Sequence, residues 1–323
     1  MTSESGGVGT RTDLRTVAVV GTGVIGSSWA AQFLARGLDV VAVDPGDRAE
    51  DRLREYVQRV WPTLRELGLA PGADPGRLRF STDAGAAAAE SDLVQENAPE
   101  RLELKRSVIR ELDAAAAPDV VIASSTSGLM PSLLQAGATR HPERVVVGHV
   151  FNPPHLIPLV EVVGGKLTST TTVDSAMAIY RALGKKPIRV SRELPGHVAN
   201  RLQAALWREA YSLIDRGAVS AEDLDAAISH GPGLRWALLG PLLTMHLSGG
   251  AGGLRHVLEH LGPPMQDWWD DLGTPLLDER LTETVLEAVG DELAGLDIGA
   301  AERDRDRILV QLLAAKSAAA HLP

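Results

Sequence analysis

The sequence contains no cysteine, no long uninterrupted apolar run and no excess of basic residues. The lack of cysteine excludes disulfide bonds, thiolate chemistry and cysteine-ligated zinc, and it is compatible with a cytoplasmic location. Charged residues interrupt every apolar segment before it reaches the roughly 20 residues that span a bilayer, so we expect no transmembrane segment. The formal charge of −10 argues against a general binder of nucleic acid or of anionic membranes, because such proteins are usually basic.

The chain of 323 residues is long enough for two domains of ordinary size. Residues 1–13 are rich in glycine, serine and threonine and lack the apolar core of a signal peptide, so we expect a disordered leader there. The rest divides into two parts with different hydrophobic periodicity, and Pro195 and Gly196 interrupt the pattern between them. The predicted domains are therefore residues 14–194 and residues 195–323.

The first part alternates short apolar runs with amphipathic segments. Helical spacing is clearest at residues 23–36 and 48–69. The predicted strands are residues 17–20, 40–43, 92–95, 120–123, 145–149, 159–163 and 187–190. Such alternation is typical of an α/β fold with a doubly wound, mostly parallel sheet.

The second part has helical periodicity throughout, which predicts an all-helical domain. The predicted helices are residues 199–216, 221–229, 254–261, 281–296 and 302–318. Ser220 is a plausible N-cap for the second of them. Because these helices offer more amphipathic surface than a bundle of this size can bury internally, we expect a homodimer built through this domain.

A glycine-rich turn joins the first predicted strand to the first predicted helix. In such a turn the first glycine permits the tight bend, the second admits a pyrophosphate close to the backbone, and the third lets helix and strand pack. Asp44, at the end of the next strand, would accept hydrogen bonds from ribose hydroxyls and repel a 2′-phosphate, which favours NAD over NADP, although Arg48 lies close by. This Rossmann-type pattern predicts cofactor contacts at Gly21, Gly23, Val24, Ile25, Gly26 and Asp44.

Four further blocks carry polar residues next to predicted strands or at the start of the helical part, namely residues 123–128, 148–153, 159–165 and 195–201. With these blocks the sequence resembles the 3-hydroxyacyl-CoA dehydrogenase superfamily from Thr16 to the end. Within it, the chain is most similar to the branch of carnitine 3-dehydrogenase and L-gulonate 3-dehydrogenase (lambda-crystallin). That closer resemblance is carried by residues 95–105, 231–247 and 252–256.

The resemblance implies that His149 is the catalytic base and that Glu161 is its carboxylate partner. Chemistry supports this, because oxidation of a secondary alcohol needs a base for the hydroxyl proton, and histidine is matched to neutral pH. A carboxylate on the other ring nitrogen would fix the tautomer. The alternatives are a hydrogen-bonded histidine at a strand end and a surface carboxylate, but the apolar neighbours of Glu161 would then bury it unpaired.

The resemblance also implies that Ser127 and Asn200 hold the reacting oxygen of the substrate, with Ser127 close to the cofactor as well. It places Glu100 and Lys105 near the nicotinamide ribose. Alternatively, Ser127 begins a helix and Asn200 caps one. Ser125 stands where many acyl-CoA members have asparagine, so a contact with cofactor or substrate could differ here.

Two features bear on the substrate. Arg235 stands where acyl-CoA members usually have an apolar residue or proline, and a guanidinium could bind a free carboxylate in bidentate fashion. Arg235 and its neighbour Trp236 are therefore predicted to contact the substrate. Trp268 and Trp269, flanked by aspartates, suit a quaternary ammonium such as that of carnitine. The alternatives are a salt bridge for Arg235 and an apolar anchor between helices or subunits for the tryptophans.

The sequence therefore predicts an NAD-dependent oxidoreductase that interconverts a 3-hydroxy acid and its 3-oxo form, with a small free acid favoured over an acyl-CoA. Other possibilities are a 3-hydroxybutyryl-CoA dehydrogenase, a β-keto reductase of polyketide metabolism, and a non-catalytic crystallin-like protein. No metal site is expected. His256 and His260 are spaced for a helical metal pair, but a solvated helix face is the favoured explanation.

Overall fold

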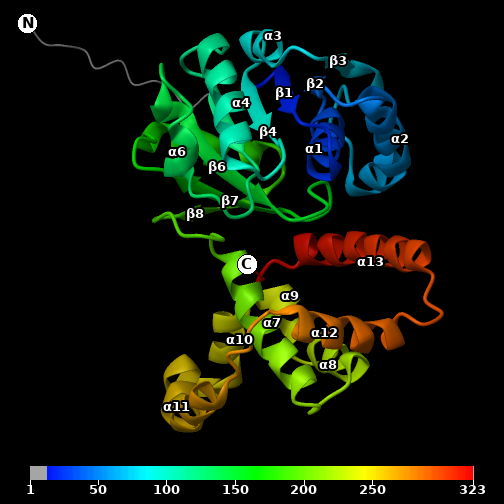
Figure 1. The fold of residues 1–323 in the computed structure, drawn as a ribbon, viewed down its shortest axis with the longest axis vertical. Coiled ribbons are helices and arrows are strands. Elements are labelled where there is room, and N and C mark those ends of the chain that lie inside the picture. Colours follow the sequence, from blue (N-terminus) through cyan, green and yellow to red (C-terminus); the bar gives the residue numbers. More distant parts are fainter. Residues whose placement is uncertain (1–12, 323) are drawn as a thin grey trace, which may run out of the picture. The chain divides into compact units, whose positions relative to one another are not determined.

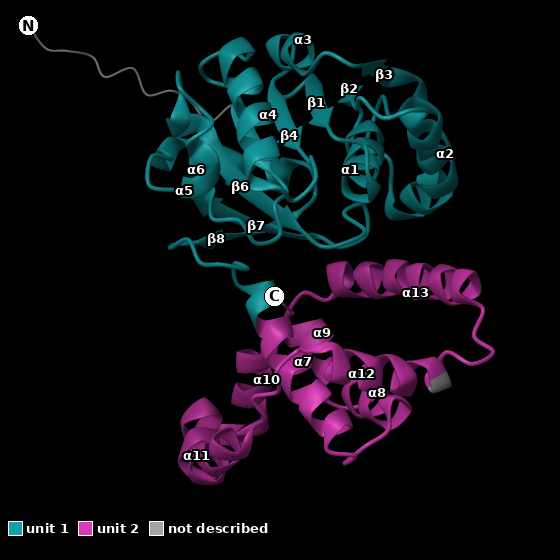
Figure 2. Ribbon diagram, viewed as in Figure 1, with its two compact units in different colours: residues 1–201 teal, residues 202–323 magenta. Residues whose placement is uncertain are grey.

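The computed structural model describes residues 13–322. The disordered leader expected for residues 1–13 lies outside the described residues apart from Asp13. The chain forms two compact units, residues 1–201 and residues 202–323 (Figure 2).

The first unit is built on one eight-stranded sheet in the order β3-β2-β1-β4-β5-β6-β7-β8 (Figure 1). All neighbouring strands are parallel except β6 and β7, which confirms the mostly parallel sheet. The strands are β1 (Thr16–Val20), β2 (Asp39–Val43), β3 (Leu78–Ser81), β4 (Leu93–Glu96), β5 (Val121–Ser124), β6 (Val145–Val150), β7 (Leu159–Gly164) and β8 (Lys186–Val190). The central strands are buried on both faces, as expected of a parallel sheet covered by helices.

Helices cover both faces of this sheet and create two separate hydrophobic cores. The helices of the first unit are α1 (Val24–Ala35), α2 (Ala49–Leu67), α3 (Ala84–Ala89), α4 (Leu102–Ala115), α5 (Pro131–Gln135) and α6 (Thr170–Ala182), with single 3₁₀ turns η1 (Pro75–Arg77) and η2 (Pro142–Arg144). One core contains side chains from α1, α2 and α6, and the other contains side chains from α3, α4 and α5. The architecture is the doubly wound α/β fold that the alternating pattern predicts.

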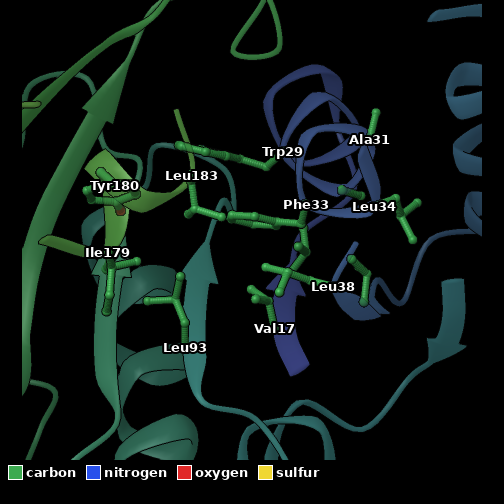
Figure 3. Close-up of a cluster of buried hydrophobic side chains, with 14 of the residues drawn as sticks. Val17, Trp29, Ala31, Phe33, Leu34, Leu38, Leu93, Ile179, Tyr180 and Leu183 are labelled. Atoms are coloured by element: carbon green, nitrogen blue, oxygen red, sulfur yellow. The ribbon is translucent and has the colours of Figure 1, made fainter. Parts of the chain in front are cut away.

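An aromatic stack is central to the first of these cores (Figure 3). Trp29 and Phe33, one helical turn apart on α1, lie with ring centroids 5.0 Å from each other. Tyr180 of α6 stacks on Trp29 at 5.7 Å. All three side chains are fully buried, so they fix α1, and with it the glycine-rich turn that precedes α1, against the sheet.

The second unit is helical, as predicted. It contains most of α7 (Ala199–Asp215), followed by α8 (Ala221–Ser229), α9 (Pro232–Leu239), α10 (Pro241–Ser248), η3 (Gly250–Gly252), α11 (Gly253–Asp271), α12 (Glu279–Glu292) and α13 (Ile298–Ala318). Ser220 caps α8 by accepting a hydrogen bond from the backbone of Asp223, as its position suggested. Among its described residues only Ala221, Val257 and Leu281 are buried hydrophobic residues.

The structure differs from the sequence prediction at four elements. Strand β3 was not predicted; it is a short edge strand with an exposed Arg79. Helices α9 and α10 were not predicted either, because Gly240 at their junction interrupts the periodicity. The predicted end of α11 at residue 261 is wrong, since the helix runs on through Pro263 and Pro264 to Asp271.

Candidate active site

The glycine-rich turn between β1 and α1 has the geometry of a pyrophosphate cradle. Gly21 has φ +88°, and a Cβ there would lie 2.6 Å from the Asn97 carbonyl oxygen. A Cβ on Gly26 would overlap the Gly21 carbonyl, whereas Gly23 faces open space. Helix α1 begins with no side-chain cap, so the amide groups of its first turn remain available for an anion.

Asp44 lies immediately after β2 and is held by the same turn. Its Oδ2 accepts hydrogen bonds from the backbone N (2.8 Å) and the Oγ1 (3.0 Å) of Thr22, and its Oδ1 accepts one from Gly46 N (2.8 Å). Burial alone would raise the pKa of Asp44, but these hydrogen bonds and the charge of Arg52 outweigh burial and lower it. The carboxylate is therefore ionised at neutral pH and suited to accept hydrogen bonds from ribose hydroxyls. The turn and Asp44 together fit an NAD molecule.

His149 and Glu161 form a buried pair at the antiparallel contact of the sheet. They are direct register partners on β6 and β7, and His149 Nδ1 lies 2.7 Å from Glu161 Oε2. Burial would raise the pKa of Glu161, but the hydrogen bond from His149 and those from the amides of Ala199 and Val198 lower it. An ionised Glu161 places the imidazole proton on Nδ1, so the free Nε2 of His149 can accept a proton.

Asn200 lies beside that free nitrogen and is hydrogen-bonded to Ser127. Asn200 Nδ2 is 3.4 Å from His149 Nε2, and the same amide donates to the Ser127 carbonyl oxygen at 2.9 Å. Ser127 is exposed, and its hydroxyl has no hydrogen-bond partner within residues 13–322. The structure thus brings four of the predicted residues together within the first unit.

Glu100 holds the backbone of the loop that carries Ser127. Its Oε1 accepts hydrogen bonds from the amides of Ser127 (3.0 Å) and Gly128 (3.1 Å) and from the Thr126 hydroxyl. This role in ordering the loop was not predicted. The predicted contact between Glu100 and the nicotinamide ribose stays a prediction.

Lys105 is 1% exposed, and its ammonium is bound by a carboxylate that sequence reasoning missed. Lys105 Nζ lies 3.0 Å from Glu96 Oε1, and Ser124 donates its hydroxyl to Glu96 Oε2. Glu100 Oε2 is 3.7 Å from the same ammonium. The available signal was a run of polar residues at the end of a buried strand, where parallel sheets gather functional groups.

The remaining predicted contacts lie in the second unit. Arg235 and Trp236 are exposed on α9, and Arg235 has no ion-pair partner among the described residues. Trp268 and Trp269 on α11 are each 59% exposed. No cluster of three or more metal-ligating side chains is found in residues 13–322, nor is any helix there long and apolar enough to cross a membrane.

A doubly wound sheet with a glycine-rich dinucleotide turn and a buried His–Glu pair defines an NAD-dependent dehydrogenase. The chain belongs to the 3-hydroxyacyl-CoA dehydrogenase family. Residues 16–194 match the NAD binding domain of 3-hydroxyacyl-CoA dehydrogenase, and residues 196–283 match its C-terminal domain. The family, the NAD cofactor and the oxidoreductase class predicted from the sequence are confirmed.

The chain is similar over nearly its whole length to several L-carnitine dehydrogenases. It is 48% identical over 303 residues to that of Bacillus cereus, covering 94% of this chain and 93% of the relative. It is 50% identical over 297 residues to that of Nocardiopsis dassonvillei, covering 92% and 90%.

A solved structure is similar across both units. It is 5-formyl-3-hydroxy-2-methylpyridine 4-carboxylic acid 5-dehydrogenase, described as an NAD+-dependent dismutase. The TM-score is 0.81 at 34% identity, and the match covers 94% of this chain and 99% of the other.

Proposed function

We propose that this protein oxidises L-carnitine, or a 3-hydroxy acid very close to it, to the 3-oxo acid with NAD. The observation that carries this proposal is the 48–50% identity to L-carnitine dehydrogenases over at least 90% of both chains. The polar groups needed for catalysis are retained and adjacent, namely His149, Glu161, Ser127 and Asn200. Their presence argues against a purely structural, non-catalytic role.

In this proposal His149 is the general base. Its Nε2 takes the proton of the substrate hydroxyl while Nδ1 keeps its hydrogen bond to Glu161. Glu161 accepts two backbone hydrogen bonds on its other oxygen, so it stays ionised and stabilises the imidazolium that forms. The Ser127 hydroxyl and the Asn200 amide hold the substrate oxygen beside Nε2 as that oxygen gains charge.

The cofactor is assigned to the edge of the sheet where β1 and β2 end. The amides of Val24 and Ile25 at the start of α1 would bind the pyrophosphate, and Asp44 would bind the adenosine ribose. NAD, when bound, supplies the hydride acceptor. We assign residues 14–194 to NAD binding and residues 195–323 to substrate binding and dimerisation. The boundary near residue 195 is supported by the two family matches, which span residues 16–194 and 196–283.

Two groups of the second unit suit the two ends of carnitine. The exposed guanidinium of Arg235 is available for the carboxylate. The neighbouring indoles of Trp268 and Trp269 offer faces that suit a trimethylammonium group. We propose Arg235 as the group that selects a free acid over a thioester.

A substrate panel tests the proposal through NADH formation. It contains L-carnitine, D-carnitine, 3-hydroxybutyrate, gulonate, 3-hydroxybutyryl-CoA, the neutral isostere of carnitine in which carbon replaces nitrogen, and the pyridine carboxylic acid of the structural relative. We expect the highest kcat/KM for L-carnitine and a loss of roughly tenfold or more for the neutral isostere, because a desolvated cation–π contact contributes about 2 kcal/mol.

Comparable turnover of the isostere would show that the cation is not recognised. Preference for the CoA thioester would contradict the assignment of Arg235. Turnover of the pyridine carboxylic acid named above, with none of carnitine, would replace the proposal by the activity of that structural relative.

We further propose a homodimer formed through the second unit. Large hydrophobic side chains there are exposed in numbers that a monomer rarely shows, including Leu242 at 70%, Leu276 at 77% and Leu277 at 68%. A second copy that covers these side chains would give this unit the apolar core that it lacks on its own. A cytoplasmic location, expected from the lack of cysteine, stays a prediction.

A further inference from the structure

A second buried histidine lies against the proposed catalytic base. His197 is 0% exposed and stands in the segment between β8 and α7. Its backbone has φ +50°, a conformation that residues other than glycine rarely adopt. Its ring centroid is 5.2 Å from that of His149, with the planes inclined at 44°.

The hydrogen bond of His197 determines its tautomer. Its Nε2 lies 3.2 Å from the carbonyl oxygen of Thr126, which can only accept, so the proton is on Nε2. Its buried Nδ1 has no hydrogen-bond partner in the described part of the chain. A polar atom buried without a partner destabilises the fold, which points to a role other than packing.

Neighbours of His197 connect it to the loop of Ser127 and to Glu161. Thr126, whose carbonyl it binds, directly precedes Ser127. The next two amides along the chain, those of Val198 and Ala199, donate to Glu161 Oε1 at 2.9 and 3.0 Å. The His197 ring thus ties the loop of Ser127 to the segment that binds Glu161.

Three titratable side chains from other parts of the first unit interact electrostatically with His197, namely His149 on β6, Glu161 on β7 and Glu100 between β4 and α4. Burial lowers the pKa of His197, and the neighbouring His149 lowers it further, while the bond to Thr126 and the carboxylates of Glu161 and Glu100 act in the opposite sense with smaller effect. The ring is therefore neutral at neutral pH. A neutral ring leaves His149 as the only one of the two that takes up a proton during turnover.

We propose that His197 is a positioning residue for the proton transfer. Its Nε2–H holds the Thr126 carbonyl, and its ring packs against His149, so that the Ser127 hydroxyl, the Asn200 amide and His149 Nε2 converge on one substrate oxygen. This inference rests on the proposed function of that site. The residue touches neither substrate nor cofactor in this scheme and acts through its neighbours.

The test compares His197→Phe with His197→Gln. Phenylalanine keeps a ring against His149 and removes the unpaired Nδ1, but it also leaves the Thr126 carbonyl without this donor. Because these two effects on stability oppose each other, we expect the melting temperature to change little. We expect kcat to fall roughly 10- to 100-fold with the KM for NAD within about twofold, because displacement of a reacting group by 1 Å can cost about 100-fold. Glutamine can still donate to Thr126, and it should restore kcat to within about threefold of the wild type.

A matched control is His141→Phe, which removes a partly exposed imidazole bound to Glu143 and should leave kcat unchanged. A second measurement does not depend on activity. Nitrogen NMR of the histidine rings should show His197 as the neutral Nε2–H tautomer at neutral pH.

An Nδ1–H tautomer or a charged ring would overturn the inference even if no substrate of the panel were turned over. So would full activity of His197→Phe, or a failure of glutamine to do better than phenylalanine. Absence of turnover by the wild type on the whole panel would instead refute the proposed function, with the tautomer still deciding the inference.

Discussion

At the scale of single residues, the proposed chemistry depends on which nitrogen of His149 is free. Glu161 occupies Nδ1, and Asn200 approaches Nε2 to 3.4 Å. We predict that His149→Ala lowers kcat about 10²- to 10⁴-fold, the usual contribution of a general base. NADH binding, followed by its fluorescence, should stay within about twofold, since His149 is not assigned to the cofactor. An activity loss smaller than about tenfold would assign the base to another residue.

A second residue-scale prediction concerns Asp44. Its ionised carboxylate stands where the 2′-phosphate of NADP would approach, so Asp44→Ala should narrow the preference for NAD over NADP by roughly tenfold, equivalent to about 1.4 kcal/mol. The measurement is the ratio of kcat/KM for the two cofactors. Asp47→Ala, which removes an exposed carboxylate nearby, is the control. Unchanged selectivity would mean that Asp44 does not contact the ribose.

The sequence permits prediction of residues that act alone more readily than of residues that act through a network. His149 and Glu161 could be assigned because the family resemblance places them, and general acid–base chemistry supports a histidine paired with a carboxylate. The bond from Glu96 to Lys105 could not, because it depends on β4 and α4 meeting in space. The contact between His197 and Thr126 could not be predicted either, since it depends on a left-handed backbone at His197 and on two segments that are far apart in the sequence.

At the scale of elements, Lys185 anchors the connection between β6 and β7. It is 5% exposed, donates to the carbonyl oxygens of Pro154 and Ile157, and lies 5.3 Å over the Trp29 ring. Burial, with a smaller contribution from the charge of Arg36, lowers the pKa of Lys185 to about 7. The connection that leads away from His149 is thus held by an amine that titrates near neutrality.

This shift predicts how stability depends on pH. Between pH about 7 and its unfolded pKa of 10.5, Lys185 binds more protons in the unfolded chain than in the folded one, so it makes the free energy of unfolding rise with pH. Lys185→Met should remove that rise, whereas Lys186→Met, at the exposed neighbouring position, should keep it. Urea unfolding at several pH values measures both. Parallel pH profiles for wild type and Lys185→Met would contradict the prediction.

The elements that could be predicted from the sequence are those whose side chains form the hydrophobic core. Val-rich strands buried on both faces, such as β6, are evident from composition. Strand β3 was not predicted, because an edge strand of four residues pairs with a neighbour on one side only and therefore needs no continuous apolar run. The predicted end of helix α11 came too early, because proline usually ends a helix. In this helix Pro263 and Pro264 only lack their own backbone N–H donors, and the helix continues beyond them.

At the scale of the whole molecule, the exposed leucines of the second unit predict a stable homodimer. Light scattering after size-exclusion chromatography should give twice the chain mass of 34.3 kDa at micromolar concentration. Dilution should not dissociate it readily, because large apolar interfaces of this kind are usually obligate. A mass of 34.3 kDa throughout the dilution series would refute the dimer.

Composition and periodicity predict two domains and the class of each, but they do not predict how the second unit buries its apolar surface. Among the described residues of that unit, only Val257, Leu281 and Ala221 are buried hydrophobic residues, so packing within the chain leaves most of the apolar surface of its amphipathic helices uncovered. The local hydrophobic periodicity of one chain does not reveal whether a second chain covers its apolar surface.

Helix α7 begins at Ala199, yet the second unit starts at Leu202, after Arg201. All residues assigned to the proton transfer, including Asn200, therefore precede the boundary between the two units. Recombination at this first turn of α7 would exchange the second unit for another and leave the residues assigned to proton transfer unchanged. The fold thus offers evolution a route to new acids that does not require the chemistry to be invented again.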